Sequence, residues 1–159
     1  MVTVIFIGVQ ASGKSTFFQQ HFRNTHVRIN LDMLKTRHRE NVLFQTCLSL
    51  KQPCVIDNTN PTLEDRQRYI SPACEAGFRI VGYYFQSQIK DVLGRNAARP
   101  ASEQIPEVGV LATYDRLILP SYDEGFDKLH FVSIGEDGSF HIEDWKSEVR
   151  RTRQENARL

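Results

Sequence analysis

The chain has 159 residues, a length typical of one domain, with 40% hydrophobic and 25% charged residues. This balance is typical of a globular protein and excludes a mainly disordered chain. The formal net charge of +1 argues against a strongly basic binder of duplex nucleic acid. The apolar runs are far shorter than the ~20 residues that span a bilayer, and no signal peptide is evident. The three widely spaced cysteines fit neither a disulfide framework nor a zinc site, so we expect reduced thiols and a cytoplasmic protein.

Short apolar segments alternate with helix-compatible segments along the chain. The pattern predicts strands at residues 2–7, 27–29, 54–56, 78–85 and 129–134. It predicts helices at residues 17–23, 32–51, 61–77, 88–98 and 108–117, followed by a charged C-terminal helix at about 141–159. Strands that alternate with helices form right-handed crossover units and a parallel sheet covered on both faces. We therefore predict an α/β fold with about five parallel strands flanked by helices, and one domain over residues 1–159.

The first predicted strand leads into a glycine-rich loop, Gly8-Val9-Gln10-Ala11-Ser12-Gly13-Lys14-Ser15, which matches the phosphate-loop (P-loop) pattern in full. The glycines let backbone N–H groups turn towards a phosphate, and the following helix directs its positive end to the same place. A chance match is disfavoured because a strand precedes the loop and a helix follows it. The residues expected to bind the nucleotide are Gly8, Gln10, Ala11, Ser12, Gly13, Lys14, Ser15 and Thr16.

The side chains of the loop predict a nucleoside triphosphate and magnesium as ligands. Lys14 is expected to reach the β- and γ-phosphates, and the hydroxyl of Ser15 to bind Mg²⁺. The fold is therefore predicted to be that of the P-loop NTPases. A P-loop identifies the phosphate donor and leaves the reaction open.

Two carboxylates follow predicted strands. Ligands bind at the carboxyl ends of parallel strands, so Asp32 is expected near the phosphate, where it can accept a proton from an attacking hydroxyl. Alternatively, Asp32 or Asn30 is the N-cap of the next helix, and one residue could serve both roles. Asp57 ends the third strand and is predicted to hold Mg²⁺ through water, with a polar strand cap as the alternative.

Two arginines, Arg95 and Arg99, stand four residues apart near the end of a predicted helix. This spacing places them on one helix face. On a flap they could close over the γ-phosphate and neutralise charge in the transition state. A solvated surface face is the alternative for such a pair.

Several strings together resemble the kinase domain of the polynucleotide 5′-hydroxyl kinases, repair enzymes in the AAA-type group of P-loop kinases. They are the P-loop, Ile29-Asn30-Leu31-Asp32, Val55-Ile56-Asp57-Asn58-Thr59-Asn60-Pro61, Arg95-Asn96-Ala97-Ala98-Arg99, Ile105-Pro106 and Glu124-Gly125-Phe126. They follow the family's order over about residues 4–129. The P-loop by itself is unspecific, whereas the Asp-Asn-Thr-Asn-Pro string combined with the Arg-Asn-x-x-Arg flap is much more specific.

The resemblance implies ATP as the donor and a helical lid, here at about residues 95–110. It implies that Asp32 is the general base that activates a 5′-hydroxyl. Lys14 and Arg99 would stabilise the transferring phosphoryl group, with Arg95 in the same lid. Ser15 and Asp57 would serve the Mg²⁺.

The acceptor side departs from the family's pattern. Leu31 precedes Asp32, where the family often has arginine. Lys35 lies one turn after Asp32, where some members hold the acceptor's phosphate with a basic residue. Lys35 and Arg39 belong to a basic segment that favours a phosphate-bearing acceptor, although such a run is also typical of a solvated helix face.

We therefore expect an ATP-dependent kinase with a hydroxyl acceptor, most simply a polynucleotide 5′ end. A small-molecule kinase that acts on a nucleoside, a sugar or an antibiotic is the first alternative. A regulatory module that binds ATP without phosphoryl transfer is the second, and it does not need the acceptor base or the arginine pair. No membrane partner is expected, and the sequence does not indicate an oligomeric state.

Overall fold

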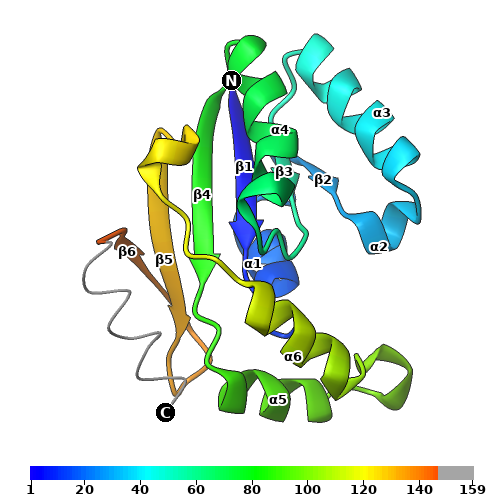
Figure 1. The fold of residues 1–159 in the computed structure, drawn as a ribbon, viewed down its shortest axis with the longest axis vertical. Helices are drawn as coiled ribbons and strands as arrows, with labels where there is room; N and C mark the ends of the chain where they lie inside the picture. The colour runs from blue at the N-terminus through cyan, green and yellow to red at the C-terminus, as the bar shows by residue number, and fades with distance from the viewer. Residues whose placement is uncertain (147–159) are drawn as a thin grey trace.

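The computed structural model describes residues 1–146, and in them a six-stranded sheet is flanked by helices (Figure 1). The strand order is β2-β3-β1-β4-β5-β6. The strands are β1 (Val2–Ile7), β2 (Val27–Ile29), β3 (Cys54–Ile56), β4 (Arg79–Phe85), β5 (Lys128–Ile134) and β6 (Phe140–Asp144). Strands β1 to β5 pair in parallel, and β6 pairs antiparallel with β5. The predicted α/β fold with a parallel sheet is confirmed, with one strand more than expected.

The helices divide between the two faces of the sheet. They are α1 (Lys14–His21), α2 (Leu31–Leu34), α3 (Arg37–Ser49), α4 (Leu63–Glu75), α5 (Ile89–Ala97) and α6 (Glu107–Arg116), with short 3₁₀ turns at Ala101–Glu103 and Tyr122–Glu124. Alternate residues of β1 point to opposite faces. Phe6 packs with Phe17 of α1, whereas Ile5 belongs to a larger core with residues of α3, α4 and α6. In Figure 1, α5 and α6 lie beyond the carboxyl ends of β1 and β4.

The segment predicted as one helix over residues 32–51 is broken into α2 and α3. Lys35 has a left-handed backbone, with φ of 71°, and this ends α2. The hydroxyl of Thr36 then accepts a hydrogen bond from the backbone N–H of Arg39 and caps α3. Two cap residues in succession therefore separate the segment that carries Asp32 from the longer helix.

The prediction of a helix at about 141–159 is wrong for its first residues, because residues 140–144 form β6. A turn over residues 135–139 causes this difference: Gly138 has φ of +80°, and the N–H of Gly135 donates to the carbonyl of Ser139 at 2.8 Å. The turn folds the chain back onto β5. Trp145 then buries its ring against Tyr84. The remainder of that predicted helix, residues 147–159, lies outside the described residues.

Among residues 1–146, no helix is both long enough and apolar enough to cross a membrane.

Candidate active site

The P-loop connects β1 to α1 at the carboxyl edge of the sheet. Gly13 has φ of +98°, and a Cβ atom there would stand 3.0 Å from side-chain carbons of both Ile134 and Phe140. A glycine is therefore required at this position for both backbone angle and space. The N–H of Gly8 donates to the carbonyl of Thr59 at 3.0 Å, which fixes the loop to the segment after β3.

Lys14 folds back over the loop that precedes it. Its side-chain Nζ donates to the carbonyls of Gly8 at 2.9 Å and Val9 at 2.6 Å. Burial lowers the pKa of Lys14 to about 8, while Asp57 opposes this shift, Arg99 adds to it and Asp32 opposes it. A phosphate in the loop would provide the anion that a buried ammonium group needs.

Ser15 and Asp57, the predicted magnesium residues, both contact the guanidinium of Arg28. The guanidinium of Arg28 donates to the Asp57 carboxylate, at 2.8 Å from Nε and 2.6 Å from Nη2. Its Nη2 also donates to the Ser15 hydroxyl at 2.9 Å. One cationic group spans both oxygens, so the two side chains lie close enough to share a cation. A hydroxyl and a carboxylate are also oxygen ligands of the kind that Mg²⁺ takes in proteins.

Asp32 lies on α2, and the structure removes the alternative that it caps this helix. The cap is Asn30, whose Oδ1 accepts from the N–H of Met33 at 2.9 Å. The Asn30 side chain also donates to the carbonyl of Asp57 at 2.6 Å, so α2 is attached to the end of β3. Asp32 is exposed in the first turn of α2, where its carboxylate can meet a ligand.

Two adjoining pockets meet at Asp32. One, of about 140 Å³, lies over the P-loop, and the other, of about 290 Å³, extends towards α3 and α6. Both are lined by Gln10, Asp32, Asn58, Thr59 and Ile105. We call them the P-loop pocket and the second pocket. A carboxylate on their common wall can approach groups bound on either side.

The α5–α6 segment contacts the P-loop directly. Arg95 Nε donates to the carbonyl of Ala11 at 2.8 Å, and Gln10 Nε2 donates to the Thr113 hydroxyl of α6 at 3.1 Å. Arg99 lines the P-loop pocket. Burial lowers the pKa of Arg95, with Asp91 opposing the shift. The structure therefore brings both arginines to the P-loop, and their role in phosphoryl transfer stays a prediction.

The predicted acceptor residues are placed differently. Neither Lys35 nor Arg39 is among the residues that line the two pockets, and Arg39 donates to the carbonyl of Leu34 at 3.5 Å. Arg37 and Arg116 line the second pocket instead. Arg37 belongs to the basic segment that the sequence shows around Lys35 and Arg39. Arg116 lies on α6, and no pattern in the sequence around it predicts a place in the site.

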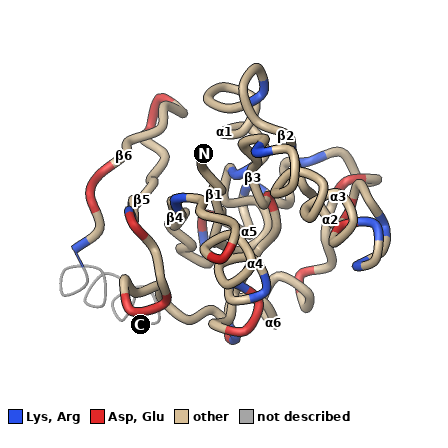
Figure 2. The backbone as a smooth tube through the Cα atoms, turned by 90° about the horizontal axis from the view of Figure 1, so that it is seen from above, with Lys and Arg blue, Asp and Glu red and all other residues tan. Residues whose placement is uncertain are grey.

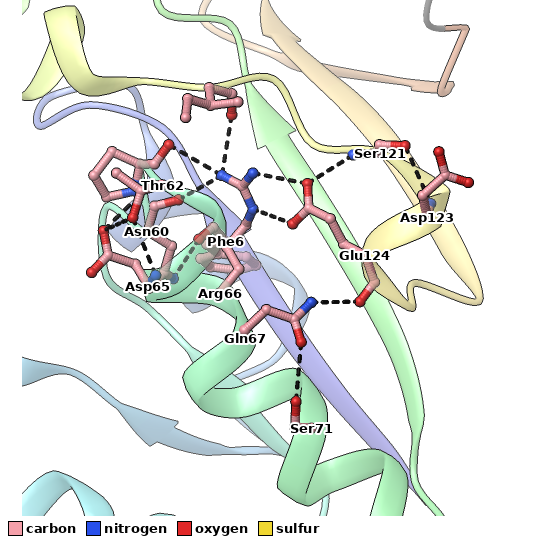
Figure 3. Close-up of polar contacts among 12 residues, drawn as sticks. Phe6, Asn60, Thr62, Asp65, Arg66, Gln67, Ser71, Ser121, Asp123 and Glu124 are labelled. Atoms are coloured by element: carbon pink, nitrogen blue, oxygen red, sulfur yellow. Dashed lines mark hydrogen bonds and ion pairs between the residues drawn. The ribbon is translucent and has the colours of Figure 1, made fainter.

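The Asp-Asn-Thr-Asn-Pro string, residues 57–61, contributes to the lining of both pockets. Asn60 adopts a left-handed backbone, with φ of 45°, and its buried amide donates to the carbonyl of Phe6 in β1 at 2.7 Å. Arg66 of α4 is fully buried and donates to the carbonyls of Asn60 at 3.1 Å and Pro61 at 3.2 Å. The same guanidinium pairs with both oxygens of Glu124, at 2.6 and 2.8 Å (Figure 3). Arg66 therefore connects the Glu-Gly-Phe string to the Asp-Asn-Thr-Asn-Pro string.

Proteins with known names match most of this chain in sequence. A family model described as "AAA domain" matches residues 3–118. The bifunctional polynucleotide phosphatase/kinase of Schizosaccharomyces pombe is 32% identical over 133 residues, which are 81% of this chain and 33% of that protein. The putative bifunctional polynucleotide phosphatase/kinase of Acanthamoeba polyphaga mimivirus is 31% identical over 152 residues, 90% of this chain and 36% of that protein. The chain spans about a third of the length of the curated relatives it matches.

A solved structure supports the fold assignment independently. Chaetomium thermophilum Kti12 in complex with ADP-AlF3 superposes with a TM-score of 0.64 at 12% identity. The match covers 97% of this chain and 96% of that one. From the P-loop, the strand order and the family match, we conclude that this chain belongs to the AAA domain family, as a kinase-type P-loop domain.

Proposed function

We propose that this chain transfers the γ-phosphoryl group of ATP to the 5′-hydroxyl of a polynucleotide end. The observation that carries the proposal is the position of Asp32 on the wall shared by the two pockets. A donor bound on the P-loop and an acceptor bound in the second pocket would both lie against this carboxylate. A nucleotide-binding module without phosphoryl transfer needs no such group.

The chemical step needs a base, an electrophile and charge stabilisation. Asp32 takes the proton of the acceptor hydroxyl while the oxygen of that hydroxyl forms a bond to the γ-phosphorus. The bond between the γ-phosphorus and the β,γ-bridging oxygen breaks, and ADP leaves with that oxygen. Lys14 and Arg99 stabilise the charge on the transferring group, and Arg95 holds the α5–α6 segment, the proposed lid, against Ala11. Mg²⁺, when bound by Ser15 and Asp57, would neutralise charge on the β- and γ-phosphates.

Two arginines of the second pocket support an anionic acceptor. Arg37 and Arg116 line it from α3 and α6, together with the carboxylates of Asp32 and Asp65, and Arg116 Nη2 lies 3.7 Å from Asp65. Figure 2 shows basic and acidic residues along the α2–α3 segment. Guanidinium groups are suited to phosphate, to which they can donate two parallel hydrogen bonds. The names of the two curated relatives point to the same class of acceptor.

We also propose that the protein acts in the cytoplasm, where free cysteines such as Cys47, Cys54 and Cys74 stay reduced.

The test is transfer of labelled γ-phosphate from ATP, with Mg²⁺, to a panel of acceptors. The panel contains 5′-hydroxyl DNA and RNA oligonucleotides, nucleoside 3′-phosphates, free nucleosides and sugars. Asp32→Asn is expected to reduce labelling of the true acceptor by about 10²–10⁴-fold and to leave ATP binding unchanged. Label on small molecules alone would replace the polynucleotide with a small-molecule acceptor. A loss smaller than about threefold in Asp32→Asn would remove Asp32 from the role of base.

A further inference from the structure

A buried carboxylate lies directly behind the two pockets. Glu40, in the first turn of α3, is 1% exposed. Its Oε1 accepts from the Asn58 side-chain amide at 2.5 Å and from the Tyr69 hydroxyl at 2.9 Å. Its Oε2 accepts from Arg37 at 2.8 Å. A buried charge is costly unless it is paired and hydrogen-bonded, and this one has three donors.

Glu40 fixes the orientation of the Asn58 side chain. Because the Asn58 amide nitrogen donates to Glu40, its Oδ1 is turned the other way, where it accepts from the N–H of Leu31 at 2.9 Å. Leu31 is the first residue of α2, and Asp32 is the second. A helix of four residues is not stable by itself. Its position therefore depends on the Asn58 and Asn30 side chains that hold its first turn.

The same carboxylate also holds a residue of the second pocket. Arg37, which lines that pocket, donates through Nη1 to Glu40 and, at 2.9 Å, to the Tyr69 hydroxyl. Tyr69 is 2% exposed, and burial, followed by Glu40, raises its pKa, so its hydroxyl keeps the proton that it donates. Glu40 thus reaches the α2 backbone through Asn58 and the second pocket through Arg37. Glu40 is not among the residues that line either pocket.

We propose that Glu40 is a positioning residue. It fixes the position of Asp32, the proposed base, relative to Arg37, the proposed acceptor-binding arginine. This inference rests on the proposed function, since it assigns Asp32 and Arg37 to the acceptor. Loss of the network would let α2 shift while the P-loop keeps its own contacts. The expected consequence is a defect in use of the acceptor with ATP binding intact.

The test uses Glu40→Gln, which keeps the size of the side chain. Glutamine offers one acceptor oxygen and one NH₂ group, so it cannot accept from three donors at two oxygens. We expect kcat/KM for a 5′-hydroxyl oligonucleotide to fall by about 10–100-fold, since small misplacements of reacting groups have effects of this size. The dissociation constant for ATP should change less than about twofold. Tyr69→Phe, which removes one of the three donors, should give a smaller defect of the same kind.

A direct readout of the network is hydrogen exchange at backbone amides, measured by NMR. The Leu31 amide should exchange at least about tenfold faster in Glu40→Gln, while amides of α1 keep the wild-type rate. Leu48→Ala is the matched control, because Leu48 is a buried apolar residue of the same helix and is not one of the side chains that contact Glu40. It should lower stability and leave the acceptor kinetics and the Leu31 amide as in the wild type.

The outcomes separate the two proposals. If wild type labels the oligonucleotide and Glu40→Gln matches it in both kcat/KM and Leu31 exchange, the positioning role is wrong. The role is equally wrong if Leu48→Ala, at a similar loss of stability, shows the same kinetic defect. If wild type labels no acceptor, the proposed function fails, and the exchange of Leu31 still decides whether Glu40 holds α2.

Discussion

Arg28 contacts both residues that we propose to hold Mg²⁺, and this makes a prediction about stability. Its guanidinium contacts Asp57 at 2.6 Å and Ser15 at 2.9 Å. A hydrated Mg²⁺ and a guanidinium cannot stand between the same two oxygens, so we expect binding of Mg·ATP to move Arg28 aside. Replacing Arg28 should therefore destabilise the protein without ligand, and much less so with Mg·ATP bound.

The magnitude follows from burial. Removing one partner of a fully buried ion pair costs about 3–5 kcal/mol. The Asp57 side chain is 2% exposed but that of Arg28 is 26% exposed, so solvent screens part of the pair. We expect Arg28→Gln to lose about 1–3 kcal/mol in EDTA, or about 3–10 °C in Tm for a domain of this size. Arg28 also lies over the Phe18 ring at 5.4 Å, and the loss of this contact should leave a drop of about 2 °C with Mg·ATP present.

The assay is thermal unfolding in EDTA, in ATP with EDTA, and in saturating Mg·ATP. The stabilisation by Mg·ATP should be larger in Arg28→Gln than in wild type, because no internal cation has to be displaced. Arg23→Gln, at an exposed arginine in the loop after α1, is the control for loss of a surface charge. An equal drop in Tm of Arg28→Gln with and without Mg·ATP would refute the placement of magnesium at Ser15 and Asp57.

Three further predictions concern other parts of the site. The pKa of Lys14 is lowered from 10.5 to about 8, so between these pH values the unfolded state binds more protons than the folded state. As pH rises from 8 to 10.5, wild type should therefore gain up to about 3 kcal/mol of stability relative to Lys14→Met, and parallel urea titrations of the two proteins would measure this gain. Arg116→Ala should raise the acceptor KM about tenfold, as expected for loss of a charged hydrogen bond, whereas Arg39→Ala should not; equal effects in steady-state kinetics would contradict the assignment of the second pocket. Glu124→Gln leaves the buried Arg66 charge without its partner and should cost about 3–5 kcal/mol in urea unfolding; a loss below about 1 kcal/mol would argue against this pair as a support of the site.

Local patterns in the sequence predict most of this fold. Apolar strands that alternate with helices gave the parallel sheet, and the P-loop pattern gave the phosphate site between β1 and α1. The break after α2 was missed because it depends on Lys35 adopting a left-handed backbone, which lysine rarely does. β6 was missed because charged residues on an exposed edge strand resemble those of an exposed helix.

The candidate site was predictable where its residues end strands. Asp32 and Asp57 follow β2 and β3, so topology brings both to the P-loop. Other residues that line or support the second pocket come from elsewhere in the chain. Arg116 approaches from α6, and Glu40 acts from the buried side of α3. Such contacts arise from tertiary packing, which no spacing in the sequence encodes.

The two edges of the described sheet bear on how the protein behaves in a crowded solution. An edge strand offers unpaired backbone groups to which a strand of another molecule can bond, and this is a route to aggregation. At one edge, β2 is three residues long, which leaves little backbone to pair. At the other, β6 carries Glu143 and Asp144 on exposed positions. Short length at one edge and negative charge at the other disfavour the addition of a foreign strand at either side.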